Sequence, residues 1–330
     1  MPPADEAGGF FMKAPAVLIF VLAMGSFRHQ HLLGIAELSR EDIELIFHRA
    51  EAYLPYCRSA LHRLPDLRGK SVVLAFFEPS TRTRVSFELA ARRLSADVVS
   101  FQAAGSSLAK GESLLDTVQT LEAMGIDALV IRHHASGVPW FLRRFLRCSI
   151  VNAGDGHHEH PTQALLDGFT LWKHFGRLEG LRVCIVGDVL HSRVARSNIA
   201  LLRLFGAEVG LCGPLTLVPR EAEQVWGVRL FTSLQDAVRW ADALNVLRLQ
   251  RERMESGLIP SLEEYHRFFG ITPQVLAWNP RVRILHPGPV NYGIELTPEV
   301  ALGPNAHIRQ QVTHGVAIRM AVLSLLLGVS

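Results

Sequence analysis

The feature that most constrains the fold is an alternation of apolar runs with amphipathic stretches. The run SVVLAFF at residues 71–77 is continuous, as in a strand buried on both faces, and the apolar side chains of residues 85–94 follow with helical spacing. A second series of the same kind begins after Gly180. Strands that alternate with helices at this spacing form parallel sheets, so the chain is predicted to be α/β, with two doubly wound parallel-sheet domains.

Other elements follow from the same patterns. The first helix is expected after an N-cap at Ser39. In the second series, strands are expected at residues 181–188, 207–214, 228–231 and 243–249, and helices at 193–205 and 234–241. Residues 161–176 are expected to form a helix that joins the two domains, and residues 310–327 a long apolar helix. Because His314 and Arg319 interrupt this last helix, we expect it to pack back on the first domain rather than span a membrane.

The composition supports two globular domains. With 330 residues, 48% of them apolar and 20% charged, the chain has enough apolar material for a large core. The 34 basic and 31 acidic side chains leave a net charge of +3, and no block of Lys or Arg resembles a nucleic-acid-binding arm. A small anionic substrate is compatible with this balance, whereas neither a nucleic acid nor a membrane is an expected partner.

The cysteines are scattered, without a C-x-x-C pair or a Cys/His spacing typical of zinc ligands. They are Cys57, Cys148, Cys184 and Cys212. The sequence therefore indicates neither a disulfide framework nor a metal site, and no cofactor is expected. The thiols fit a reducing cytoplasm.

The amino terminus contains one segment that could be a targeting signal, because Lys13 precedes an apolar run at residues 14–24. This run is too short to span a bilayer, and it lacks a clear A-x-A cleavage site. We expect residues 1–26 to be a dispensable extension, with Met24 as the native start. Sequencing of the native amino terminus would test this expectation.

The densest group of chemically active side chains directly follows the first predicted strand. It places three hydroxyls and two guanidiniums at a helix start, in the order Ser80, Thr81, Arg82, Thr83 and Arg84. The unpaired N–H groups at a helix amino terminus favour an anion, and arginine adds paired donors that match phosphate oxygens. The pattern predicts a phosphate cradle without glycine. The alternative is a solvated helix start with Ser80 as its N-cap.

The segment FFEPSTRTRVSFELAA resembles the carbamoyl phosphate motif of the aspartate and ornithine carbamoyltransferases. Three further motifs of that family occur in the expected order. They are Arg132-His133 after a strand, HPTQ at residues 160–163, and HPGP at residues 286–289. Together the four motifs cover nearly the whole chain from His29 onward. The glycine of HPGP departs from family members that carry leucine between the two prolines.

Two motifs and several polar side chains favour the aspartate enzymes of this family. Ornithine enzymes typically carry cysteine in HPCQ and HCLP, where this chain has Thr162 in the first motif and His286-Pro287 in the second. L-aspartate brings two carboxylates that need cations, and Arg193, Arg248 and Gln250 lie near the carboxyl ends of predicted strands, where open α/β sheets bind ligands. In extended backbone Arg248 and Gln250 point to one face. The alternatives are a solvated arginine at a helix start and a charge on an edge strand.

The resemblance implies a transferase that makes N-carbamoyl-L-aspartate and phosphate from carbamoyl phosphate and L-aspartate, a step of pyrimidine biosynthesis. It assigns residues 27–160, completed by the helix 308–330, to carbamoyl phosphate, and residues 161–307 to aspartate. It also implies a homotrimer in which a neighbouring subunit donates the loop that carries Ser107 and Lys110. Whether the trimers join a regulatory chain, a dihydroorotase or neither is left open.

The resemblance further implies a role for each site residue. The residues expected to hold phosphate are Ser80, Thr81, Arg82, Thr83, Arg132, Ser107 and Lys110. Those expected to face the carbonyl oxygen of the carbamoyl group are Thr83, Arg132 and His160. The carbamoyl nitrogen is expected to donate to Gln163 and to backbone carbonyls of Pro287, Gly288 and Pro289. The carboxylates of aspartate are expected to contact Arg193, Arg248, Gln250 and Lys110.

Other interpretations stay open. His157, His158 and His160 suggest a metal cluster, but they lack the i, i+4 helical pair of zinc-binding histidines, and Pro161 places His160 just before a helix. There the helix dipole favours a neutral imidazole that donates a hydrogen bond. The strand VCIVGD resembles a dinucleotide-binding strand, although the turn after it lacks GxGxxG. Ornithine or another amino acid as the acceptor, and a noncatalytic scaffold, are the remaining alternatives.

Overall fold

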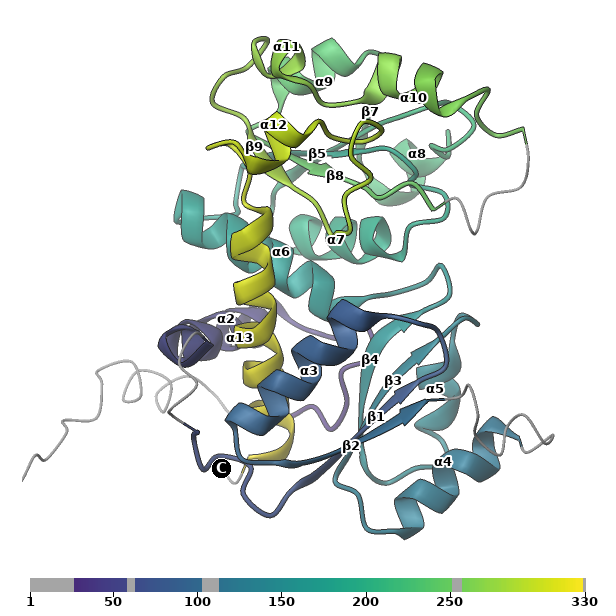
Figure 1. Ribbon diagram of the computed structural model, residues 1–330, viewed down its shortest axis with the longest axis vertical. Helices are drawn as coiled ribbons and strands as arrows, with labels where there is room; N and C mark the ends of the chain where they lie inside the picture. The colour runs from purple at the N-terminus through teal and green to yellow at the C-terminus, as the bar shows by residue number, and fades with distance from the viewer. Residues whose placement is uncertain (1–26, 58–62, 103–112, 251–256, 329–330) are drawn as a thin grey trace, which may run out of the picture.

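The computed structural model describes residues 27–57, 63–102, 113–250 and 257–328. The expected extension at residues 1–26 lies outside these ranges. Two β-sheets organise the described chain, one in each half of an elongated molecule (Figure 1).

All neighbouring strands in both sheets are parallel. The first sheet has the order β2-β1-β3-β4, formed by Asp97–Gln102, Ser71–Phe76, Ala128–His133 and Ser149–Asp155. The second has the order β7-β6-β5-β8-β9, formed by Arg229–Phe231, Glu208–Cys212, Arg182–Val186, Ala243–Val246 and Arg283–Leu285. The predicted pair of doubly wound parallel sheets is thereby confirmed. The strand order reverses between β1 and β3 and between β5 and β8, and such switch points are where open α/β sheets bind ligands.

Helices flank both sheets. In the first half, α2 (Arg40–Tyr53) follows its predicted N-cap, because the Ser39 hydroxyl accepts from the Asp42 N–H at 3.1 Å. The other helices of this half are η1 (Leu54–Cys57), α3 (Thr81–Arg93), α4 (Leu114–Ala123), α5 (Val138–Leu142) and α6 (Pro161–Phe175). Those of the second half are α7 (Arg193–Leu204), α8 (Ala222–Trp226), α9 (Leu234–Trp240), α10 (Leu262–Phe269), α11 (Pro273–Leu276) and α12 (Pro298–Leu302).

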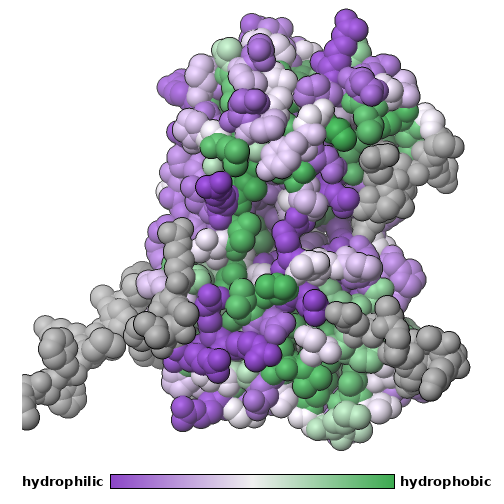
Figure 2. Space-filling view, viewed as in Figure 1, coloured by the Kyte–Doolittle hydropathy of each residue, from purple (hydrophilic) through white to green (hydrophobic). Residues whose placement is uncertain are grey.

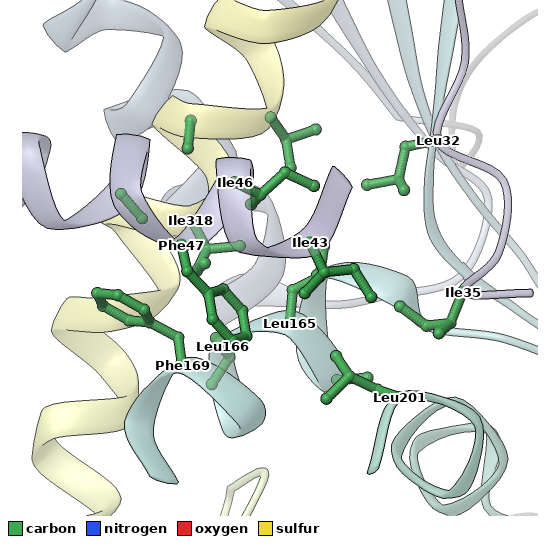
Figure 3. Packing of buried hydrophobic residues seen from close by; sticks show 14 of the residues in the cluster. Leu32, Ile35, Ile43, Ile46, Phe47, Leu165, Leu166, Phe169, Leu201 and Ile318 are labelled. Atoms are coloured by element: carbon green, nitrogen blue, oxygen red, sulfur yellow. The ribbon is translucent and has the colours of Figure 1, made fainter. Parts of the chain in front are cut away.

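The last helix, α13 (Ile308–Leu327), connects the two halves. It begins beside the second sheet and runs along α6, α2 and α3 into the first half, as predicted (Figure 1). Its Ile318 joins a core in which side chains of α2, α6 and α7 meet, among them Phe47, Phe169 and Leu201 (Figure 3). One continuous apolar core therefore spans the waist of the molecule, so the ends of the two sheets are held in a defined relation.

Two boundaries differ from the predictions by more than two residues. Helix α3 begins at Thr81 instead of Val85, because the Arg84 N–H already donates to the Ser80 carbonyl at 3.2 Å. Strand β8 ends at Val246, because the Leu249 N–H leaves the sheet and donates to the Glu295 carboxylate at 2.8 Å. The helices that the apolar pattern did not predict are α4, α5, α8, α10, α11 and α12. Over the described ranges, no helix combines enough length with enough apolar character to cross a bilayer.

Candidate active site

The predicted site residues gather where the carboxyl ends of both sheets approach each other. The segment after β1 and the end of β3 flank the switch point of the first sheet, and the segments after β5 and β8 flank that of the second. Figure 2 shows the surface indented between the two halves, with hydrophilic side chains around the indentation. The two switch points thus face one shared region.

The predicted phosphate cradle forms the amino terminus of α3. Ser80 occupies the N-cap position in extended backbone, but its side chain caps no backbone N–H group. Thr83 is buried, whereas Thr81 and Arg82 remain exposed. The helix contains no acidic residue in its first turn. Its partial positive charge and its hydroxyls are therefore suited to an anion.

A glutamate that the sequence analysis gave no role links the two sheets. Glu78 lies between β1 and α3, and its carboxylate accepts from Arg132 at 2.7 Å and from Arg193 at 2.7 and 3.0 Å. Arg132 lies one residue before the end of β3 of the first sheet, whereas Arg193 begins α7 after β5 of the second sheet. Arg193 is only 4% exposed, so its pairing with Glu78 is shielded from solvent. Glu78 therefore fixes two guanidiniums, one from each half, in one place.

A glycine makes room for these two guanidiniums. A Cβ atom on Gly154 would lie 3.0 Å from Arg132 Nη1 and 3.0 Å from Arg193 Nε. Its φ of +116° is also one that side-chain-bearing residues rarely adopt. The Arg132 Nη1 donates to the neighbouring Ala153 carbonyl at 3.2 Å. Both arginines are thus laid against the backbone of β4.

Arg82 approaches the HPGP loop of the second half. A Cβ atom on Gly288 would lie 3.1 Å from the Arg82 Cζ, and the φ of Gly288 is +63°. Although the Arg82 side chain is exposed overall, partial desolvation of its guanidinium and the positive charge of nearby Arg248 lower its pKa. A second cluster of positive charge therefore forms where α3 meets the segments after β8 and β9.

The HPGP loop is fixed by a buried histidine. Gly288 N–H donates to His286 Nδ1 at 2.8 Å, so the ring proton lies on Nε2, which faces Glu295 at 3.3 Å. Burial lowers the pKa of His286, and the charges of Arg82 and Arg248 act in the same direction. A neutral imidazole thus shapes the loop backbone around Gly288.

Glu295 also orients the segment that carries two predicted aspartate ligands. Its carboxylate accepts from the Leu249 N–H, and the Leu249 side chain is fully buried. The half-buried neighbours Arg248 and Gln250 flank this anchor. The backbone here is not a strand, yet the alternation of burial agrees with the prediction that both polar side chains share one face.

His160 holds the N-cap position of α6 and is 4% exposed. Its backbone N–H donates to the Ser197 hydroxyl at 2.8 Å, and Ser197 in turn donates to the Glu159 carboxylate. Burial raises the pKa of Glu159. This buried chain anchors His160 to α7 of the second half. Among the described residues, no group of three or more His, Cys, Asp and Glu side chains is arranged to hold a metal ion.

Gln163, in the first turn of α6, belongs to a buried polar cluster. Its amide nitrogen donates to Asp167 at 2.9 Å. Three other amides donate to the same carboxylate, from Asn198 at 2.9 Å, Asn245 at 3.3 Å and Gln311 at 2.7 Å. Burial raises the pKa of Asp167 to about 6. The carboxylate is therefore ionised above that pH and meets four neutral donors from four different elements.

Models of one protein family match almost the whole chain. Residues 30–173 match the aspartate/ornithine carbamoyltransferase carbamoyl-P binding domain, and residues 179–326 match the Asp/Orn binding domain of the same family. The chain belongs to the aspartate/ornithine carbamoyltransferase family.

Relatives in this carbamoyltransferase family are similar over nearly their full length. An aspartate carbamoyltransferase catalytic subunit from Gemmatimonas aurantiaca is 54% identical over 298 residues, which cover 90% of this chain and 93% of the relative. One from Carboxydothermus hydrogenoformans is 51% identical over 303 residues, which cover 91% of this chain and 97% of the relative. A solved aspartate transcarbamoylase from Trypanosoma cruzi, in complex with carbamoyl phosphate and aspartate, has a TM-score of 0.82 at 32% identity and covers 90% and 97% of the two chains.

The structure brings together most of the carbamoyltransferase motifs. The amino terminus of α3, Arg132, His160 and Gln163 come from the first half and α6, whereas Arg193, Arg248, Gln250 and the HPGP loop come from the second. Ser107 and Lys110 lie outside the described residues. Sequence analysis missed Glu78, Gly154 and Asp167. Glu78 stands inside the quoted FFEPSTRTR segment, so its charge beside two predicted ligand arginines was the available signal.

Proposed function

We propose that the chain transfers the carbamoyl group of carbamoyl phosphate to the α-amino group of L-aspartate, which yields N-carbamoyl-L-aspartate and phosphate. The proposal rests on one observation. Glu78 pairs with Arg132 at the switch point of the first sheet and with Arg193 at the switch point of the second sheet, so the two switch points face each other. Relatives at 50% identity and above are named aspartate carbamoyltransferase catalytic subunits, which supports the acceptor.

In this proposal the phosphate group binds at the amino terminus of α3. Ser80, Thr81 and Thr83 supply hydroxyl and backbone donors, and Arg82 supplies a guanidinium. Arg132 from the neighbouring strand end adds a second guanidinium, and Ser107 and Lys110 complete the set. These cations stabilise the leaving phosphate as its negative charge grows.

The carbonyl oxygen of the carbamoyl group faces Thr83, Arg132 and His160. These donors stabilise the negative charge of the tetrahedral intermediate that forms when the amine attacks. His160 acts as a neutral donor, since the positive end of the α6 dipole disfavours an imidazolium. Gln163 and the backbone carbonyls of the HPGP loop, Pro287, Gly288 and Pro289, accept from the carbamoyl nitrogen. The reaction needs no covalent enzyme intermediate and no cofactor.

The acceptor binds on the other side of the same region. Arg193, Arg248 and Gln250 hold the two carboxylates of L-aspartate, and Lys110 contributes from its loop. This fixes the α-amino group opposite the carbamoyl carbon, and positioning of this kind supplies a large part of the rate enhancement. Because the two ligand sets lie on different sheets, substrate binding draws the halves together and excludes water.

The wider setting is part of the proposal. Each substrate has its own domain in this proposal. Carbamoyl phosphate is bound by residues 27–160 together with residues 308–330, and aspartate is bound by residues 161–307. The proposed assembly is a homotrimer with shared sites, in the cytoplasm, acting in pyrimidine biosynthesis. A regulatory chain or a dihydroorotase would be an additional partner of the trimer.

The test is carbamoyl transfer by the purified chain with carbamoyl phosphate and either L-aspartate or L-ornithine. Product from aspartate alone, with a large loss in Arg248→Ala and little loss in the exposed control Arg281→Ala, supports the proposal. Turnover of ornithine would overturn the acceptor while leaving the phosphate site in place. Turnover of neither amino acid would make a noncatalytic scaffold the better account.

A further inference from the structure

One buried carboxylate orients two glutamines beside the candidate site. Asp167 is fully buried on α6, and its Oδ1 accepts from Gln163 Nε2 at 2.9 Å and from Gln311 Nε2 at 2.7 Å. Its Oδ2 accepts from Asn198 and Asn245. An ionised carboxylate has about four acceptor positions, so all of them are used here. The donors come from α6, α13, α7 and β8, so Asp167 is hydrogen-bonded to elements of both halves.

The contact fixes which end of each glutamine amide faces outward. An amide is planar, with the NH₂ group and the oxygen on opposite sides of its carbon. Because the Gln163 nitrogen faces Asp167, its oxygen is turned away from Asp167 and is presented as an acceptor. The Gln311 nitrogen faces the same carboxylate, and its oxygen accepts from the His286 backbone N–H at 3.0 Å.

Gln311 in turn fixes the start of the HPGP loop. His286 receives this backbone contact and also accepts the Gly288 N–H on its ring, so two hydrogen bonds set the loop backbone. The carbonyls of this loop and the Gln163 oxygen are the acceptors assigned above to the carbamoyl nitrogen. Both sets of acceptors are therefore oriented through Asp167.

We infer that Asp167 is a positioning residue that makes the site select an acyl phosphate with an NH₂ group on its acyl carbon. The inference rests on the proposed function and deepens it. Without the ionised carboxylate, the Gln163 amide can rotate and present NH₂ to the NH₂ of the ligand, where two donors meet and no hydrogen bond forms. The phosphate cradle on α3 does not depend on this carboxylate.

A role in stability alone would act differently. Arg319 of α13 is the charged group whose electrostatic interaction with Asp167 is recorded, and it donates to the Ser86 hydroxyl on α3 at 2.8 Å. If Asp167 only held these helices together, its loss would weaken every ligand of the site to a similar degree. Selection for NH₂ predicts a loss restricted to ligands that carry that group.

The experiment compares carbamoyl phosphate with acetyl phosphate, in which a methyl group replaces NH₂. Dissociation constants are measured by calorimetry for the wild type and Asp167→Asn. We expect carbamoyl phosphate to bind about 10- to 100-fold more weakly to the variant, as for the loss of one or two well-placed hydrogen bonds, and acetyl phosphate to change less than about 3-fold. Equal weakening of both ligands, or no change in either, would overturn the inference.

A second variant and a matched control keep the test decisive. Gln311→Met frees the His286 backbone but leaves Gln163 on Asp167, so we expect a loss of about 3- to 10-fold for carbamoyl phosphate only. Asn245→Ala removes a donor from the other carboxylate oxygen and leaves both glutamines in place, so both ligands are expected to bind as in the wild type. If Asp167→Asn does not fold, an equal effect of Gln311→Met on both ligands would overturn the inference.

The outcome is separable from that of the proposed function. Calorimetry with the two acyl phosphates needs no acceptor, whereas the proposed function is judged by carbamoylation of L-aspartate in the wild type. A wild type that binds carbamoyl phosphate selectively but carbamoylates no aspartate refutes the proposed acceptor and supports the role of Asp167 in selection. A wild type that carbamoylates aspartate but binds both acyl phosphates equally refutes the inference alone.

Discussion

Two groups of side chains at the waist of the molecule differ in their charge. At the strand ends, Arg132 and Arg193 share the Glu78 carboxylate, and Arg82 lies near Arg248. In the second turn of α6, the single carboxylate of Asp167 accepts hydrogen bonds from four neutral amides. The first group gathers positive charge where an anion is expected. The second fixes the direction of hydrogen bonds through neutral amide donors.

The largest expected effect is the loss of activity when one guanidinium is removed from the first group. We expect Arg82→Ala to lower kcat by about 10²–10³-fold, the usual effect of losing one donor that stabilises developing charge. The measurement is the initial rate of carbamoyl transfer to aspartate. Arg92→Ala, at the exposed far end of the same helix, removes the same charge and should leave the rate within about 2-fold, because Arg92 forms a partly exposed i, i+4 pair with Glu88 at 3.1 Å. Equal losses in the two variants would contradict the assignment.

The next test concerns the carboxylate in the arginine group. Glu78→Gln keeps the shape but removes the charge that holds Arg132 and Arg193, so we expect kcat/KM for aspartate to fall about 10- to 100-fold, as when charge-assisted hydrogen bonds are lost. Steady-state kinetics check this, with Glu88→Gln as the surface control. An unchanged kcat/KM would mean that the bridge does not position the two arginines.

Gly154 tests how closely the backbone must approach the same pair. Gly154→Ala should destabilise the fold by about 2 kcal/mol, because the new methyl group meets two guanidiniums at a φ that alanine rarely adopts. Gly176→Ala is the matched control, since that glycine also has a positive φ but no atom within 4 Å of the added Cβ. Its cost should be about 1 kcal/mol. Urea unfolding measures the free energy of unfolding of both variants. Equal losses of stability would show that the two guanidiniums move aside to accommodate the methyl group.

The smallest expected effect is a change in the pH dependence of stability, caused by a histidine that lies near other basic side chains outside both groups. Burial, together with the charges of neighbouring His174 and Arg283, lowers the pKa of His307 to about 4. The unfolded chain therefore binds more protons than the folded one between pH 6.5 and about 4, so this contribution to stability is complete above pH 6.5 and is lost as the pH falls through that window. Because His307 is only partly buried, the loss should be about 1 kcal/mol. Unfolding of His307→Gln should lack this pH-dependent part, and an identical slope would contradict it.

The sequence predicted best what depends on local pattern. Apolar runs placed β1 and the strands β5 to β8, although not β2, β4 or β9. The N-cap at Ser39 placed α2, and Pro161 placed the start of α6. Each of these signals acts within a few residues, so tertiary contacts seldom override it. The start of α3 was misplaced because Thr81–Arg84 lack apolar periodicity, although the helix needs only their backbone hydrogen bonds there.

The unpredicted part of the site depends on contacts between distant residues. Glu78 meets Arg193 across 115 positions, and Asp167 meets Gln311 across 144. No local spacing signals such pairs, and a single aspartate inside an apolar helix is not distinctive. The end of β8 was misplaced for the same reason, because Glu295, 46 positions away, takes the Leu249 N–H out of the sheet. The roles of Ser107 and Lys110 stay predictions.

The path of α13 has a consequence for how the chain is made. This helix is translated after all the other described elements, yet it covers α2 and α3, which are made more than 200 residues before it. At a translation rate of about 5–20 residues per second, the apolar faces of α2 and α3 stay uncovered for on the order of ten seconds before α13 is made. During synthesis the first half is therefore exposed to chaperones and to association with other nascent chains, and a ribosome that stalls before Ile308 releases a product whose earliest part cannot finish folding.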